Sequence, residues 1–281
     1  MTLQVITTDR NRDMSEEGVF FESIQGKSAQ TQKSYRQQYK RLASELDKDI
    51  HSSSQKKIIE VAGEQKTINT IQARLNIAIL VRRLYKYDVK ELEKERDKNK
   101  ERLVADVKQK NTELNLPDLS ELYEFTEYLY ENGKWTDYII NFLLLEFQVR
   151  NKDLNFTIVK RKRDAEDEHK NYIWLDRNKA IYIRRDYKTV GTYGTKTNTI
   201  YDVKFLTALR NVLKKGDTFI PNEDQVGYYV KKATYKELGE GAYMKIMVNA
   251  YRDDLQKLRQ LSTNRGTHIN TIASHYDVSL Q

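Results

Sequence analysis

A tyrosine close to the end of the chain is the residue whose surroundings most suggest chemistry. Tyr276 closes the stretch that runs from Arg265 through a Gly-Thr-His turn, and it lies nine residues after Thr267. A tyrosine phenol ordinarily loses its proton near pH 10, so one that attacks phosphorus needs cations or a base beside it. With such neighbours, Tyr276 becomes a candidate nucleophile toward a DNA phosphate.

The first cation in a fitting context is Arg150. It ends the apolar run that begins at Leu143, and Asp153 and Leu154 follow it. Buried arginine is uncommon unless it is paired, and a guanidinium can hold a phosphate through two parallel hydrogen bonds. The alternative interpretation is an arginine that only ends a helix and compensates the helix dipole.

The second cation is Lys188, which follows a predicted strand on a turn that leads toward Ile200. A lysine on such a turn can reach a scissile phosphate and protonate the leaving oxygen. The alternative interpretation is an ordinary exposed loop lysine.

Other common chemistries find no support in the sequence. There is no cysteine, which excludes a disulfide scaffold, a thiolate zinc site and a cysteine nucleophile. The four histidines, at 51, 169, 268 and 275, lack metal-ligand spacing. The run Gly191–Lys196 does not have the phosphate-loop pattern, and no Ser/His/Asp signature is present.

Composition favours a polyanionic partner. The 281 residues suffice for two domains, and 49 Lys and Arg against 41 Asp and Glu give a net charge of +8. A soluble protein that is merely basic is the alternative. No apolar run is long enough to span a bilayer, and Met1–Arg12 lacks an apolar signal core. We therefore expect an intracellular protein, in the cytoplasm or nucleus of a host cell, with no membrane partner.

The pattern predicts a flexible or strand-like arm over residues 1–27 and a helical domain over 28–112. Apolar residues recur every three or four positions from Tyr35, and Ser54 is a predicted helix cap. Thr67–Tyr87 is the clearest helix, with arginines outside its apolar stripe. Either these cations form a solvated surface or they contact phosphates. The candidate DNA contacts in this domain are Lys33, Arg36, Lys40, Arg74, Arg82 and Arg83.

A second domain is predicted over residues 113–281. Lys90–Lys110 is a linker or a helix leading to one, and two buried helices follow at Leu122–Tyr130 and Trp135–Phe147. Two strand-like runs flank the turn Asp176–Lys179, as in a hairpin, and helices return from Val203.

In their order along the chain, these features resemble the tyrosine recombinases, the phage-integrase-like family that includes viral and mobile-element members. The Arg150-x-x-Asp153-Leu154 run is similar to the family's Arg-x-x-Glu-Leu box, and Lys188 resembles its β-hairpin lysine. The resemblance implies a mainly α protein with a small antiparallel β-sheet. It also implies a two-domain, C-shaped DNA clamp made of a helical core-binding domain and a catalytic domain.

The sequence departs from the family where a His-x-x-Arg box is expected, 31 to 32 residues before the nucleophile. Met244 and Lys245 stand there. Lys245 could supply the second cation as a point charge, without the fork of a guanidinium. The other candidates for this cation are Arg252, Arg259 and Arg265, and Arg265 is also a candidate DNA contact. His268 takes the family's second histidine position through a shift of one residue.

The resemblance implies cleavage and rejoining of double-stranded DNA through a 3′-phosphotyrosyl link, with no metal, no cofactor and no small-molecule substrate. Integration or recombination would need a homo-oligomer on DNA, a tetramer in this family. Three alternatives remain open. One is a recombinase-fold protein that binds DNA without cutting it, and another is a telomere resolvase or type IB topoisomerase-like enzyme. The third is an unrelated helical protein.

Overall fold

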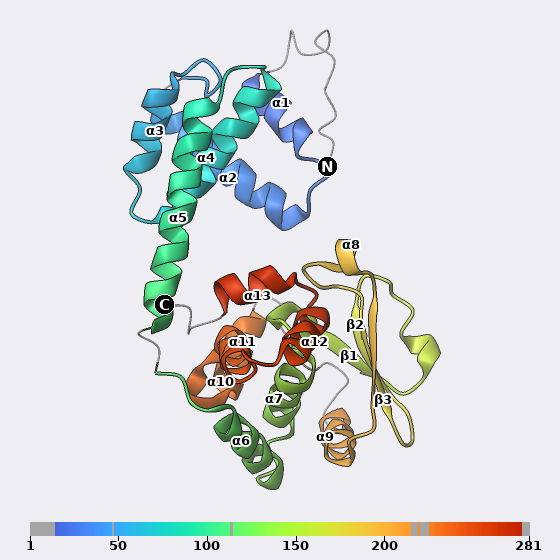
Figure 1. Ribbon diagram of the computed structural model, residues 1–281. Helices are drawn as coiled ribbons and strands as arrows, with labels where there is room; N and C mark the ends of the chain where they lie inside the picture. Colours follow the sequence, from blue (N-terminus) through green and yellow to red (C-terminus); the bar gives the residue numbers. More distant parts are fainter. Residues whose placement is uncertain (1–14, 47, 113–114, 215–218, 220–224, 277–281) are drawn as a thin grey trace. The chain divides into compact units, whose positions relative to one another are not determined.

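The computed structural model describes residues 15–46, 48–112, 115–214, 219 and 225–276. The chain divides into two compact units, Met1–Gln109 and Lys110–Gln281, whose elements are labelled in Figure 1. The division falls near the end of a helix, three residues before the boundary that we expected from the sequence. No helix of the described residues is both long and apolar enough to cross a membrane.

Unit 1 is helical throughout its described part. Its helices are α1 (Glu16–Ser23), α2 (Ala29–Leu46), α3 (Gln55–Gly63), α4 (Ile68–Leu84) and α5 (Lys90–Thr112). Hydroxyl caps define two of the starts: Ser54 accepts from the amide of Lys57 at 3.3 Å, and Thr67 accepts from that of Thr70 at 3.2 Å. The predicted cap at Ser54 is therefore confirmed.

The segment that the sequence predicted to be a flexible arm contains α1, which belongs to the core of unit 1. Phe20 is fully buried, and its ring stacks on that of Tyr39 with the centroids 5.0 Å apart. The Glu16 carboxylate accepts hydrogen bonds from the Tyr39 hydroxyl at 2.9 Å and from the Ile50 amide at 3.0 Å. The segment is too short to show a helical period, and its tertiary contacts fix it. Residues 1–14 of the predicted arm lie outside the described residues.

Two arginines of α4 that were expected on the surface are buried. Arg74 is 2% exposed and holds Glu45 with both terminal nitrogens, one of them at 2.8 Å. Arg82 donates to the carbonyls of His51 at 2.9 Å and Asp88 at 3.0 Å. These guanidinium groups are engaged inside unit 1, so phosphate contact is the wrong prediction for both. Arg83 is exposed and bonds Glu93 at 2.5 Å.

Unit 2 is also mainly helical, with a small sheet inserted after its first two helices. Its helices are α6 (Leu119–Glu131), α7 (Trp135–Phe147), α8 (Val190–Tyr193), α9 (Val203–Leu213), α10 (Val226–Ala233), α11 (Gly239–Ala250), α12 (Leu255–Arg265) and α13 (Ile269–His275). Short 3-10 turns are η1 (Asn151–Leu154), η2 (Lys162–Asp164) and η4 (Tyr235–Glu237). The predicted mainly helical fold with a small sheet is confirmed.

The sheet has four strands in the order β1-β2-β3-β4, namely β1 (Phe156–Val159), β2 (Asn171–Leu175), β3 (Ala180–Arg184) and β4 (Lys196–Ile200). The predicted hairpin is present, since β2 and β3 pair antiparallel across the turn with Leu175 opposite Ala180. β4 is antiparallel to β3 and places Lys196 opposite Arg184. β1 is parallel to β2, so the sheet is mixed where a purely antiparallel one was expected.

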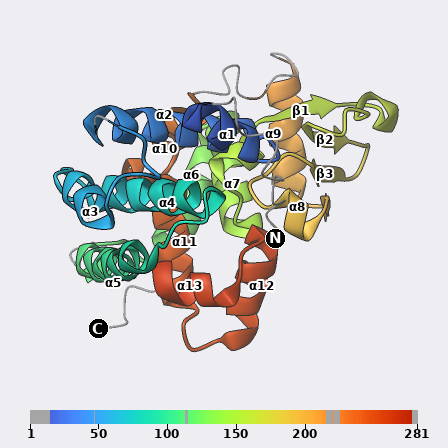
Figure 2. The same ribbon diagram turned by 90° about the horizontal axis from the view of Figure 1, so that it is seen from above.

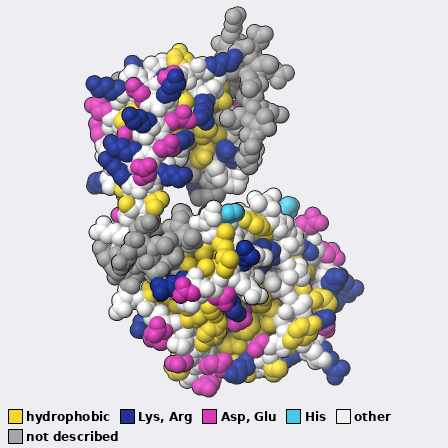
Figure 3. Space-filling view, viewed as in Figure 1, with side chains coloured by type: hydrophobic (Ala, Val, Ile, Leu, Met, Phe, Trp, Pro, Cys, Tyr) yellow, Lys and Arg dark blue, Asp and Glu magenta, His cyan; other side chains and the backbone are white. Residues whose placement is uncertain are grey.

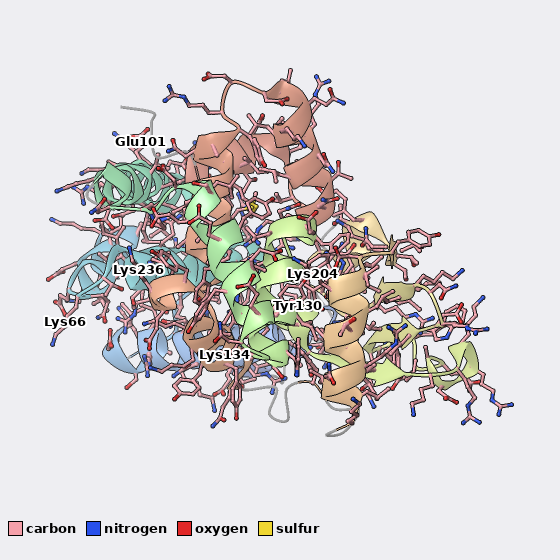
Figure 4. The ribbon with its side chains drawn as sticks, turned by 90° about the horizontal axis from the view of Figure 1, so that it is seen from below. Lys66, Glu101, Tyr130, Lys134, Lys204 and Lys236 are labelled. Atoms are coloured by element: carbon pink, nitrogen blue, oxygen red, sulfur yellow. The ribbon has the colours of Figure 1, made fainter. Side chains whose placement is uncertain are left out.

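Helix α9 lies between α7 and the strands of unit 2 (Figure 2). It packs on α7, and Figure 2 shows it beside α7 with the strands on its other side. Lys204 of α9 pairs with Glu127 of α6, and its ammonium lies 5.5 Å from the centre of the Tyr130 ring (Figure 4). Phe205 and Leu209 of α9 are buried in the core, whereas Val203 at its start is exposed.

Replacing Phe20 by alanine tests whether α1 is part of the core. Loss of this buried ring should lower the free energy of unfolding of unit 1 by about 3–5 kcal/mol. Glu22→Ala, at an exposed position of the same helix, should change it by less than about 0.5 kcal/mol. Urea unfolding of the full chain measures both values, and equal small effects would mean that the segment is an arm after all.

Candidate active site at the end of helix α12

Cationic side chains from three distant segments meet at the carboxyl end of α12. The last carbonyls of a helix have no partner within it, and positive charge is stabilising there. Arg150 donates from Nη1 to the Arg265 carbonyl at 2.7 Å. Arg184 and Lys196 donate to the Asn264 carbonyl at 3.2 Å and 3.0 Å. The helix end thus gathers the guanidinium groups of Arg150 and Arg184 and the Lys196 ammonium.

The backbone at Gly266 allows this approach. Gly266 ends α12 with φ 62° and ψ 57°, a left-handed conformation that favours glycine. A Cβ at this position would lie 2.9 Å from the Lys196 Nζ and 3.0 Å from the Thr189 Oγ1. Thr189 donates to the Gly266 carbonyl at 2.7 Å, which ties the turn after β3 to the helix end.

Tyr276 lies against the side chain of Arg265. Arg265 is 3% exposed, and its Nη2 is 3.1 Å from the Tyr276 hydroxyl oxygen and 2.7 Å from a Glu240 carboxylate oxygen. The Arg265 guanidinium carbon is 5.3 Å from the centre of the Tyr276 ring. Burial opposes the charged form of Arg265, but Glu240 and Tyr276 outweigh it and raise the pKa of this guanidinium.

The two residues that follow α7 supply further acceptors for Arg265. The Arg265 Nη1 lies 3.2 Å from the Gln148 carbonyl oxygen and 3.4 Å from the Val149 carbonyl oxygen. Those carbonyls are free because α7 ends at Phe147 and Gln148 turns left-handed, with φ 47°. Arg150 follows directly, so the same chain reversal positions both arginines. Burial and the positive charge of Arg265 lower the pKa of Arg150, which nevertheless remains charged as guanidinium groups do in proteins.

A buried ion pair supports the site from the sheet. Arg184 and Asp153 are each about 1% exposed in their side chains, with 3.4 Å between Nη1 and Oδ2. Asp153 also accepts from the Arg150 amide at 3.1 Å. Burial raises the pKa of Asp153, opposed by the hydrogen bond from the Arg150 amide and by the charges of Arg184 and Arg150. The aspartate thereby orients both arginines.

Lys196 is the lysine that the structure places among these cations. Burial, together with the positive charges of Arg184 and Arg150, lowers its pKa to about 8, although Asp153 opposes the shift. Its ammonium lies 5.5 Å from the ring centre of Tyr187. A group with this pKa exchanges its proton near neutral pH, which suits acid–base chemistry.

The residues singled out from the sequence divide into two groups. Arg150, Arg265 and Tyr276 come together. Lys188 is exposed in the turn after β3, adjacent to Thr189, which contacts Gly266. His268 is exposed and caps α13, where its Nδ1 accepts from the Asn270 amide at 3.2 Å.

Lys245 and the remaining sequence candidates lie apart from these contacts. Lys245 is half-buried on α11, and burial lowers its pKa. Among the described contacts, none links Lys245, Lys188 or His268 to Arg150 or Tyr276. Arg252 and Arg259 are exposed, on or next to α12.

The sequence did not single out Arg184, Lys196 or Glu240. The Arg184-Arg185 pair at the end of a predicted strand looks like a solvated strand end, and only the register of β3 with β4 shows that Arg184 points inward. Glu240 follows a glycine in a segment without motif, but its Oε2 accepts from the Asn151 amide. No local signal marks such long-range partners.

The predicted DNA contacts of unit 1 that remain are Lys33, Arg36 and Lys40, all exposed on α2, and Arg83, exposed on α4. Arg36 lies 4.7 Å from the centre of the Phe21 ring, and Lys40 pairs with Glu17 at 3.3 Å. On the face of unit 1 visible in Figure 3, basic side chains alternate with acidic ones. This face therefore carries a mixed charge, without a continuous basic stripe.

Comparisons with known proteins find likeness only among solved structures. No protein-family model matches the chain, and no curated protein matches its sequence. Among solved structures, XerA recombinase matches with a TM-score of 0.39 and 13% identity, over 94% of each chain. A likeness at this level carries no argument about function, so the proposals below depend on the side chains of the site. Within the described residues, no three His, Asp or Glu side chains are grouped as a metal site would need.

Replacing Arg265 by methionine should destabilise unit 2 by about 3–5 kcal/mol, because Glu240 is left as an unpaired, largely buried charge. Adding Glu240→Gln should recover part of that loss, since the stranded charge disappears. Arg252→Met, which removes an exposed partner of Asp253, should change the stability by less than about 0.5 kcal/mol. Urea unfolding of the wild type, Arg265→Met, Glu240→Gln and the double variant gives the coupling energy, and additive effects would contradict the buried pair.

Proposed function

We propose that the protein cleaves and rejoins strands of double-stranded DNA, with Tyr276 as the nucleophile. The observation that carries the proposal is the grouping of Tyr276, Arg265 and Arg150, with 3.1 Å between the Tyr276 hydroxyl and an Arg265 nitrogen. The phenol would lose its proton to solvent, and its oxygen would form a bond to phosphorus while the bond to the 5′ oxygen breaks. The leaving oxygen takes up a proton, and the phosphotyrosyl link conserves the energy of the phosphodiester.

The cations have distinct parts in this proposal. Arg150 and Arg265 stabilise the charge that builds on the phosphate oxygens in the transition state. Lys188 protonates the leaving oxygen from its exposed turn, which Thr189 holds to the α12 end. His268 adds a hydrogen bond to the phosphate. No metal is required for any of these steps.

Rejoining decides the outcome of the reaction. Return of the 5′ hydroxyl to the same strand relaxes DNA, whereas attack by a partner strand recombines two duplexes. Recombination would require several copies of the chain on DNA, and we propose a tetramer. The exposed cations of α2, with the net charge of +8, would contribute phosphate contacts from unit 1.

Covalent trapping tests the nucleophile. The protein is incubated with radiolabelled nicked duplexes from a randomised site library and denatured, and DNA-linked protein is separated by size. We expect an adduct with the wild-type chain and none with Tyr276→Phe, which keeps the ring and removes the attacking oxygen. Tyr228→Phe, at an exposed position on α10, is the matched control and should retain the adduct.

The second phosphate cation is the point on which the structure and the sequence pattern differ. Arg265 contacts Tyr276, whereas Lys245 stands where the family pattern places a cation. We expect Arg265→Lys, which loses the two-point fork, to slow adduct formation by about 10²–10³-fold. Lys245→Ala should retain most of the rate, and the opposite ranking would return the role to Lys245.

A second candidate function is DNA binding without cleavage. It is favoured by one observation: both terminal nitrogens of Arg265 are already engaged by protein acceptors, namely Glu240, Tyr276 and the carbonyls of Gln148 and Val149. Duplex binding without any adduct, in wild type and in Tyr276→Phe alike, would establish this function in place of the first.

A further inference from the structure

A cavity of about 510 Å³ opens in unit 2 at the end of the sheet away from the candidate active site. The active-site end carries Arg184 and Lys196, whereas the cavity is lined from the other end by Leu175 and the turn that follows it. Figure 1 shows α8 at one end of the strands and α9 toward the other. The cavity is therefore a separate feature of the same unit.

Its charge is strongly one-sided. Among the described residues that line it, four are cations, Lys160, Arg177, Arg210 and Lys214, and one, Asp176, carries a carboxylate. None of the four forms an ion pair within the described part of the chain. By contrast, two other exposed lysines of unit 2 have acidic partners: Lys204 pairs with Glu127 and Lys232 pairs with Glu237.

Two of these cations have hydrogen-bonded side chains, Arg210 and Lys214, and the Lys214 Nζ donates to the Asn211 Oδ1 at 3.0 Å. Arg210, on α9, donates from Nη2 to the Arg177 carbonyl at 2.7 Å, which fixes its guanidinium at the β2–β3 turn. The Asp176 carboxylate already accepts from the Arg177 amide at 2.7 Å, so part of its charge is used by the turn. Leu175, 9% exposed, gives the cavity an apolar wall.

We propose that this cationic pocket binds a phosphate-bearing ligand, distinct from the phosphate at Tyr276. Unpaired guanidinium and ammonium groups around one hollow repel each other until an oxyanion enters, and arginine binds phosphate through two parallel bonds. The volume lies in the range of small-ligand pockets, and the apolar wall suits a sugar or base beside the phosphates. The phosphate belongs either to a free nucleotide or to the backbone of duplex DNA.

Two binding measurements separate these sources, neither of which depends on strand cleavage. Calorimetry with ADP tests the free nucleotide, and titration of a labelled 20-base-pair duplex over a range of salt concentrations tests the backbone. The variants are Arg177→Ala with Arg210→Ala, and Lys160→Ala with Lys214→Ala, which keeps the Arg210 contact to the turn. Lys162→Ala with Arg163→Ala removes the same charge from exposed positions outside the cavity.

If ADP is the ligand, both pocket variants should weaken its binding at least tenfold while the control leaves it unchanged. If duplex DNA is the ligand, both should lower the slope of log affinity against log salt by about 2, with the control unchanged. The proposal is overturned if the pocket variants alter neither measurement, or alter them no more than the control does. Circular dichroism verifies that each variant folds.

Discussion

The last carbonyls of α12, which have no partner within the helix, bring three parts of unit 2 together. Each part contributes a cation that donates to this helix end: Arg150 after α7, Arg184 on β3, and Lys196 on β4. A helix end attracts positive charge because its last carbonyls lack donors and its dipole is negative there. The concentration of cations that would otherwise repel each other is thus a consequence of where α12 stops.

Buried carboxylates balance this concentration. Asp153 holds Arg184 and the backbone of Arg150, and Glu240 holds Arg265 and the backbone of Asn151. Each acid therefore links a helix or strand to the chain reversal after α7. Removing either acid would leave a cation unpaired where little water reaches it, which is destabilising. Unit 2 therefore needs the acids wherever it carries these cations.

Much of the scaffold of unit 2 follows from the sequence. The helix Trp135–Phe147 and the hairpin around Asp176–Lys179 carry strong local signals, and both are present. The site follows only in part. The sequence around Arg150 and Tyr276 indicates a role in chemistry. Arg184, in contrast, has the pattern of an exposed residue at a strand end, and no nearby motif marks Glu240. Their roles come from strand register and from contacts with residues far away in the sequence, such as Arg184 with Asn264 and Glu240 with Asn151, which local periodicity does not encode. The burial of Arg74 in unit 1 was missed for the same reason, because its partner Glu45 lies on another helix.

The contact between Arg150 and the Arg265 carbonyl has a consequence for any anion that enters the site. Nη1 of Arg150 is occupied by the carbonyl of Arg265, whose side chain contacts Tyr276, so an anion that bound through this nitrogen would compete with the helix end for it. Binding of the anion would then replace the hydrogen bond between Arg150 and the Arg265 carbonyl with one between Arg150 and the anion. The affinity for the anion would be the difference between two similar hydrogen bonds, and release of Arg150 would loosen the α12 end that precedes α13 and Tyr276.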